Sequence, residues 1–210
     1  MIPLPIFSEE LEMRYIFLIL LLICNITQAH KVIGGNENRT LQDIKIIENY
    51  YHHCDGIVLN RELVILNVFG AKRFKEELEK NNIVNANLIA KRAQAVTSKN
   101  NLIIINTAGL SDTEYLFYLA HEMTHQYQYQ LLGKSFTDDM VYLEGSADIM
   151  ASRISGQYIE IIDKKIPYAN IKDYHSFINY KHSPDHIYQA RYYMRNIKSI
   201  KIKNNNILYF

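Results

Sequence analysis

The chain has 210 residues, of which 48% are hydrophobic and 21% are charged, and its formal net charge is +1 at pH 7. This composition is typical of one globular domain and excludes a disordered or fibrous chain. So small a net charge gives no support for a nucleic-acid partner. The sequence contains no low-complexity linker and no repeat at solenoid periods, so we expect no internal domain boundary.

Near the N-terminus, residues 15–26 form an apolar run. The run is shorter than the ~20 residues that a membrane-spanning helix needs. Thr27 and Ala29 follow it and provide small side chains at the positions that a signal peptidase reads. These features predict a secretory signal peptide that ends at residue 29.

The segment before the apolar run is acidic when it is read from the first residue, but it becomes basic when it is read from Met13. Because signal peptides begin with a basic segment, we expect residues 1–29 to be the signal peptide and Met13 to be its true start. The mature chain, residues 30–210, is then a single secreted or periplasmic domain, and it is membrane-anchored only if the signal is not cleaved. Cleavage removes three glutamates and one arginine from the 22 acidic and 23 basic residues, which leaves a formal charge of +3.

The first part of the mature chain mixes helical and extended patterns. Thr40, as a capping residue in front of apolar residues at helical spacing, predicts a helix over 41–54. Residues 57–69 are rich in Val, Ile and Leu and fit either a strand or a buried helix. Residues 71–92 have the charged pattern of exposed helical structure.

The clearest strand signal is a hairpin, in which residues 95–97 and 102–106 are separated by a Ser-Lys-Asn-Asn turn. After this hairpin we expect helical structure to the C-terminus. The expected fold class is therefore α+β, mainly helical, with a small antiparallel or mixed sheet that precedes the longest predicted helix.

That helix has a well-marked start and end. Ser111-Asp112-Thr113-Glu114 is a capping box, so we expect the helix to begin at residue 112. Gly133 provides the residue that best tolerates a left-handed helix end. The sequence His-Glu-Met-Thr-His, residues 121–125, therefore lies in the middle of a helix.

His121 and His125 are separated by about 40° around the helix axis and by ~6 Å along it, so both imidazoles point to one side. Such a pair can hold a metal ion from two positions. Glu122 lies about 100° from His121 around the axis, close enough to reach a water molecule on the metal but outside the ligand positions. Neutral imidazoles suit zinc, and a carboxylate can accept a proton from its water.

A catalytic zinc ion needs a third protein ligand and leaves its fourth position open to water. Thr137, followed by acidic residues, predicts the start of a second helix, and Ser155-Gly156 predicts its end. Gly145 lies inside it, where glycine costs about 1 kcal/mol relative to alanine. We therefore expect this helix to pack closely against the histidine-bearing helix.

Glu144 lies 19 residues after His125, so a helix that returns in the antiparallel direction can bring its carboxylate opposite the two histidines. This is the placement that a third metal ligand needs. Asp148 lies four residues further on, on nearly the same face, where it can orient a ligand histidine through the other ring nitrogen.

The two motifs, HEMTH and EGSAD, resemble the gluzincin branch of the zincin metallopeptidases, whose thermolysin-like members carry HExxH and a ligand glutamate followed by an aspartate on the next helix. The resemblance covers about residues 95–155, including the hairpin, whose outer strand lines the substrate cleft in such folds. A small zincin-like catalytic domain is therefore implied, with no room for a separate substrate-binding domain. Carried over by position, the zinc ligands are His121, His125 and Glu144, the general base is Glu122, and the partner of a ligand is Asp148.

The resulting prediction is a secreted zinc metallopeptidase that hydrolyses a peptide or protein, in which Glu122 takes a proton from the zinc-bound water and delivers it to the leaving amine. Two alternatives stay open: a non-catalytic zincin-fold binding protein that keeps zinc, and a zinc hydrolase of cell-wall peptides. No motif identifies the side chain that stabilises the oxyanion, for which the candidates are Tyr142, Tyr158, His182, His186 and Tyr188.

Overall fold

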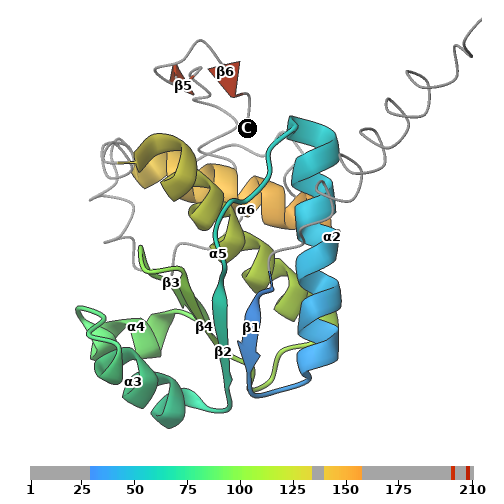
Figure 1. Cartoon of the computed structure of the whole chain (residues 1–210). Coiled ribbons are helices and arrows are strands. Elements are labelled where there is room, and N and C mark those ends of the chain that lie inside the picture. The colour runs from blue at the N-terminus through green and yellow to red at the C-terminus, as the bar shows by residue number, and fades with distance from the viewer. Residues whose placement is uncertain (1–28, 134–139, 158–199, 202–206, 209–210) are drawn as a thin grey trace, which may run out of the picture.

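The computed structural model describes residues 29–133, 140–157, 200–201 and 207–208 (Figure 1). Within these residues the structure mixes helices with a sheet, in agreement with the predicted α+β class. The predicted signal peptide lies outside the described residues, apart from Ala29. The elements in chain order are β1 (Lys31–Ile33), α2 (Glu37–Asp55), β2 (Val64–Val68), α3 (Ala71–Lys80), α4 (Ala86–Arg92), β3 (Ala95–Thr97), β4 (Leu102–Asn106), α5 (Asp112–Leu132), α6 (Met140–Ser155), β5 (Ile200–Lys201) and β6 (Ile207–Leu208).

The main sheet is mixed and has the strand order β1-β2-β4-β3. Strands β1, β2 and β4 are parallel, whereas β3 pairs antiparallel with β4 and forms one edge of the sheet. The hairpin predicted over 95–106 is thus confirmed, and of the two sheet types expected the structure has the mixed one. Parallel neighbours need long crossovers, and α2 supplies the one between β1 and β2.

Side chains of β4 alternate between two apolar layers. Ile103 and Ile105 pack with residues of α2, α5 and α6, whereas Ile104 packs with residues of α3 and α4. Figure 1 accordingly shows α3 and α4 apart from the other three labelled helices. Because both faces of the sheet are covered, its strands are rich in Ile, Leu and Val on both sides.

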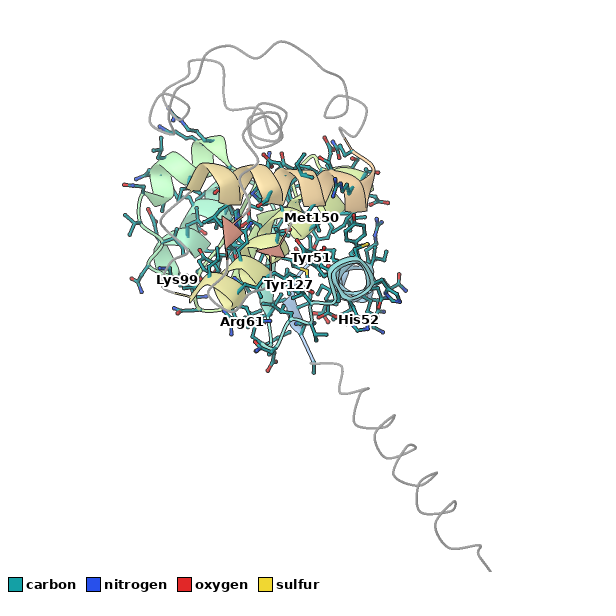
Figure 2. The ribbon with its side chains drawn as sticks, turned by 90° about the horizontal axis from the view of Figure 1, so that it is seen from above. Tyr51, His52, Arg61, Lys99, Tyr127 and Met150 are labelled. Atoms are coloured by element: carbon teal, nitrogen blue, oxygen red, sulfur yellow. The ribbon has the colours of Figure 1, made fainter. Side chains whose placement is uncertain are left out.

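The larger apolar layer is centred on aromatic side chains from two helices. Tyr51 of α2 and Tyr127 of α5 are stacked, with ring centroids 3.9 Å apart and an interplanar angle of 20°. Met150 of α6 belongs to the same buried cluster, and Figure 2 shows the three side chains together. This cluster fixes α5 against its neighbours and so positions the histidines.

The first helix begins earlier than predicted. Asn36, and not Thr40, is its cap, because the Asn36 side chain accepts a hydrogen bond from the backbone N–H of Arg39 at 3.1 Å. Thr40 lies inside α2, where its hydroxyl is 2.9 Å from the hydroxyl of Tyr115. The chain leaves β1 through Gly34-Gly35, both at positive φ, so the turn is complete by residue 36.

Other segments were predicted in outline only. The ambiguous stretch 57–69 contains a strand, β2, and the charged stretch 71–92 contains two helices in place of continuous helical structure. Asn82 and Asn85 interrupt it with φ values of +56° and +62°, a conformation that asparagine tolerates better than most residues. The expectation of helical structure to the C-terminus is wrong at β5 and β6, which pair as antiparallel strands.

Candidate metal centre

The helix that carries both histidines, α5, starts at the predicted capping box. The Ser111 hydroxyl accepts a hydrogen bond from the backbone N–H of Glu114 at 3.3 Å, and the Glu114 carboxylate accepts one from the backbone N–H of Ser111 at 2.8 Å. At the other end, Gly133 follows the last helical residue with φ +56° and ψ −120°. The predicted helix end is therefore confirmed, although the backbone of Gly133 does not adopt the left-handed helical conformation.

The middle of α5 is buried. His121 and His125 are each 5% exposed, and Glu122 is 7% exposed. Gln126, which is fully buried, donates hydrogen bonds to the Thr97 hydroxyl and to the backbone carbonyl of Ser98. These bonds tie the helix to the β3–β4 hairpin, so the two histidines lie on a helix that is fixed to the edge of the sheet.

The second helix, α6, approaches α5 closely, and their contact is the most extensive between any two helices in the described part of the chain. Its buried face consists largely of small residues, including Gly145, Ser146, Ala147 and Ser152. This matches the prediction made from Gly145. The predicted end at Ser155-Gly156 is also confirmed, whereas the predicted cap at Thr137 lies outside the described residues.

The two helices run in opposite directions. His121, in the middle of α5, contacts Asp148, while Gln128, further along α5, contacts Leu143, which lies earlier in α6. This arrangement brings Glu144 opposite the two histidines, as the spacing of the motifs predicts.

Three ligand atoms converge between the helices. Nε2 of His121 lies 3.1 Å from Nε2 of His125, and Oε2 of Glu144 lies 3.3 Å from the former and 3.5 Å from the latter. All three atoms lie within 4.8 Å of one another, and they form the one such group of three found in the described residues. This buried group of His121, His125 and Glu144 could hold a metal ion.

The other ring nitrogen of His121 is held by Asp148. The distance from Nδ1 of His121 to Oδ1 of Asp148 is 2.8 Å, and Asp148 is fully buried. An ionised carboxylate only accepts hydrogen bonds, so Nδ1 carries the hydrogen. In the neutral imidazole the lone pair is then on Nε2, which faces Glu144.

Gln128 contacts Nδ1 of His125, as Asp148 contacts Nδ1 of His121. The sequence analysis did not identify this role of Gln128. Nδ1 of His125 lies 2.8 Å from Oε1 of Gln128, whose amide nitrogen donates to the backbone carbonyl of Leu143 at 3.0 Å and to the Ser146 hydroxyl at 2.8 Å. Since Oε1 can only accept, Nδ1 of His125 is the donor. In the neutral ring, Nε2 of His125 therefore also carries a free lone pair.

Two lone pairs and a carboxylate oxygen that face one another at 3.1–3.5 Å repel unless a positive charge lies among them. A proton on one of the imidazoles supplies such a charge. Burial disfavours the charged imidazolium, but Asp148 and Glu144 outweigh it and raise the pKa of His121 well above its usual value. Burial likewise opposes ionisation of Glu144, but the two histidines lower its pKa well below the usual range.

Glu122 lies beside this group. Its negative charge is one of the causes that raise the pKa of both His121 and His125, so its carboxylate is within electrostatic reach of both rings. Burial and the charges of Glu122 and Glu144 also raise the pKa of Tyr129 to about 12. The Tyr129 phenol therefore keeps its proton at neutral pH and is a hydrogen-bond donor next to the cluster.

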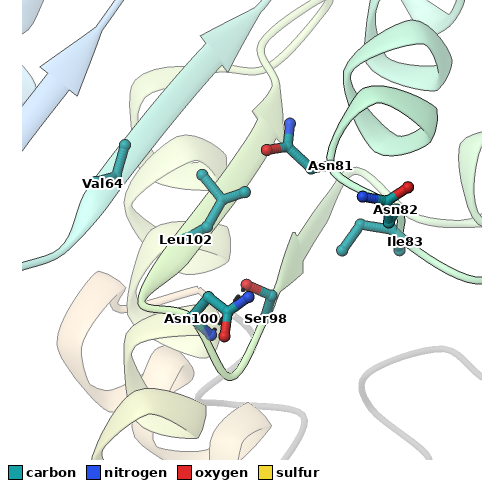
Figure 3. A pocket seen from close by; sticks show the side chains of 7 residues that line it. All are labelled: Val64, Asn81, Asn82, Ile83, Ser98, Asn100 and Leu102. Atoms are coloured by element: carbon teal, nitrogen blue, oxygen red, sulfur yellow. Dashed lines mark hydrogen bonds between the residues drawn. The ribbon is translucent and has the colours of Figure 1, made fainter.

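None of the predicted oxyanion candidates can be placed, because the side chain of Tyr142 and residues 158–199 lie outside the described part. The structure also has a hollow of about 500 Å³ on the other face of the sheet, where Val64 and Leu102 form its apolar side (Figure 3). Its other lining residues are Asn81, Asn82, Ile83, Ser98 and Asn100. Because α5 packs on the opposite face, this hollow is separate from the histidine cluster.

No protein-family model, curated protein or solved structure matches this chain. Among the described residues, no helix is both long enough and apolar enough to cross a membrane.

Proposed function

We propose that this protein is a zinc-dependent metallopeptidase, in which His121, His125 and Glu144 hold the zinc ion and Glu122 is the general base. The observation that carries the proposal is the buried convergence of two imidazole nitrogens and one carboxylate oxygen within 4.8 Å of one another. The Nδ1 hydrogens of both imidazoles are engaged elsewhere, so the three atoms present lone pairs to a common point. Two histidines and one carboxylate form a ligand set of catalytic zinc that leaves one position open.

The same ligand set also suits iron(II). Glu122 favours hydrolysis, since a buried carboxylate next to a ligand histidine is the group that a hydrolytic site needs to move a proton. A bound zinc ion supplies Lewis acidity, which lowers the pKa of a coordinated water toward ~7 and polarises a carbonyl oxygen. Glu122 then accepts a proton at its carboxylate and returns it to the leaving amine.

The edge of the sheet supports a peptide substrate. Gln94 and Ser98 are hydrogen-bonded to β4, so by the antiparallel alternation the backbone groups of Ala95 and Thr97 point away from the sheet. No other described strand pairs with this side of β3. An extended peptide can add there as a further strand through main-chain hydrogen bonds. Because Gln126 ties β3 to α5, such a peptide runs beside the histidine cluster.

The first test is the metal content of the purified protein. About one zinc ion per chain is expected in the wild type. Glu144→Ala should lower the zinc content strongly, whereas Glu62→Ala, which removes an exposed carboxylate, should leave it unchanged. Folded wild-type protein that binds no zinc would refute the metal site.

The second test separates an enzyme from a binding protein. Glu122→Gln keeps the size and burial of the side chain but removes its ability to accept a proton. It should retain zinc and lose the hydrolysis of casein, free peptides or cell-wall peptide fragments. Full activity of this variant would refute the role of Glu122, and a zinc-loaded wild type that cleaves none of these substrates would favour a binding protein.

A further inference from the structure

We infer that Gln128 is a positioning residue of the metal site, which fixes the ring of one ligand and the helix segment that carries another. The inference rests on the proposed function only in taking His125 and Glu144 as metal ligands. Gln128 is 1% exposed, so its amide must find its hydrogen-bond partners inside the protein. It does so on both sides, with His125 of its own helix and with two groups of α6.

The orientation of the Gln128 amide follows from the chemistry of its partners. The backbone carbonyl of Leu143 can only accept a hydrogen bond, so the nitrogen of the amide must face α6. The oxygen then faces His125, and it requires the hydrogen on Nδ1 of that ring. A backbone carbonyl of α6 therefore sets, through one side chain, which nitrogen of His125 is available to a metal ion.

The contacts of Gln128 flank the third ligand. Leu143 directly precedes Glu144, and Ser146 lies two residues after it. The Ser146 hydroxyl donates to the carbonyl of Leu143 at 3.0 Å, so it receives the Gln128 hydrogen bond as an acceptor. The same amide thus holds the α6 turn that presents Glu144 at a fixed distance from His125.

The two histidines have partners of different charge. His121 is held by the carboxylate of Asp148, whereas His125 is held by a neutral amide oxygen. A neutral partner sets the tautomer of His125 without adding a further negative charge to a site that already contains Glu144 and Glu122. Gln128 therefore sets the orientation of the His125 ring and adds no charge to the site.

The test compares two substitutions of Gln128. Gln128→Met keeps the length of the side chain but removes the acceptor for Nδ1 of His125. Gln128→Glu keeps an acceptor for Nδ1 and removes the donor to Leu143. Gln128→Met also removes the donor to α6, so if Gln128 fixes both ligands this variant should weaken zinc binding by about 10–100-fold. Gln128→Glu loses only the contacts to α6 and should show a clearly smaller loss. Ser146→Ala, which leaves the bond to His125 intact, should stay close to the wild type.

Zinc affinity is measured by competition with a chromophoric chelator, and the tautomer of His125 is measured by nitrogen-15 NMR of the metal-free protein at a pH high enough for the ring to be neutral. The wild type and Gln128→Glu should carry the hydrogen on Nδ1, and Gln128→Met should show a mixture of tautomers. Equal losses of affinity in both variants, with an unchanged tautomer, would overturn the inference because they indicate a purely structural role. A wild type without zinc affinity would instead refute the proposed function, and the NMR measurement would still decide the role of Gln128.

Discussion

Oδ1 of Asp148 faces the Nδ1 hydrogen of His121 at a nitrogen–oxygen distance of 2.8 Å, from a fully buried position one helical turn after Glu144. Asp148→Asn retains an acceptor for this hydrogen but removes the negative charge. We expect zinc affinity to fall by about 10-fold or more, and the pKa of His121 in the metal-free protein to fall as well, because Asp148 is a main cause of its rise.

The control for this substitution is Asp55→Asn, which changes a carboxylate at the end of α2 that is not part of the group of His121, His125 and Glu144. Zinc affinity is measured by chelator competition and the pKa of His121 by NMR titration. The assigned role of Asp148 would be wrong if both variants bound zinc as tightly as the wild type.

Removal of the metal should destabilise the protein. A ligand that binds only the folded state stabilises it by about 2.7 kcal/mol when its concentration is 100-fold above its dissociation constant. The urea midpoint of the wild type should therefore fall on addition of a strong chelator. Glu144→Ala, which lacks a ligand, should show almost no response. A chelator that shifts both proteins equally would indicate an effect unrelated to the site.

The metal-free protein should be most stable in mildly acidic solution. Glu144 has a lowered pKa, so its contribution is present above its ordinary value of 4.5 and is lost as the pH falls below it. His121 has a raised pKa, so its contribution is present below its ordinary value of 6.5 and is lost as the pH rises toward the raised value. The maximum stability of the metal-free protein is therefore expected between the two ordinary pKa values, at pH 4.5 to 6.5.

The zinc-loaded protein should behave differently, because metal binding requires deprotonated ligands and strengthens as the pH rises. Thermal midpoints measured across the pH range with zinc and with chelator should therefore show optima that differ, the metal-free one being more acidic. Glu144→Gln, which removes the charged partner, should flatten the metal-free profile. Identical profiles with zinc and with chelator would contradict this prediction.

The capping box sets the start of α5, the helix that carries His121 and His125. Ser111→Ala removes the side-chain acceptor of the Glu114 N–H and should lower the free energy of unfolding by about 1 kcal/mol. Thr113→Ala, an exposed substitution one residue before Glu114, is the matched control and should have a smaller effect. Because the cap lies more than two turns from His121, zinc content should not change in either variant. Urea unfolding and zinc analysis test both statements.

The stacked tyrosines of the core should respond in opposite ways to loss of their hydroxyls. Tyr51 donates a hydrogen bond to the Thr124 hydroxyl at 2.7 Å, so Tyr51→Phe should destabilise the protein by about 1 kcal/mol. The hydroxyl of Tyr127 is buried without a hydrogen-bond partner among the described residues, so Tyr127→Phe should be neutral or stabilising. Urea unfolding of the two variants checks the difference, and equal losses would contradict it.

Much of the site could be predicted because its signals are local. The capping box and the helical period suffice to put His121 and His125 on one side of α5. The spacing to Glu144 then suffices to place its carboxylate opposite them, if the next helix returns antiparallel. The hairpin of β3 and β4 is equally local. The true cap at Asn36 was missed because two capping residues four positions apart, Asn36 and Thr40, compete, and the preceding glycines, whose conformation depends on β1, decide between them.

The sequence by itself determined which residues are candidate metal ligands and the helical face that two of them share, since helix geometry depends on neighbours only a few residues apart. Only the tertiary structure decided that β1, β2 and β4 are parallel, that β3 is an edge strand of the described sheet, and that Gln128 joins His125 to the segment before Glu144. These relationships are hydrogen bonds between residues brought together by the packing of separate elements. Local periodicity carries no information about them, because a buried amide takes whichever partners the packed helices bring within reach.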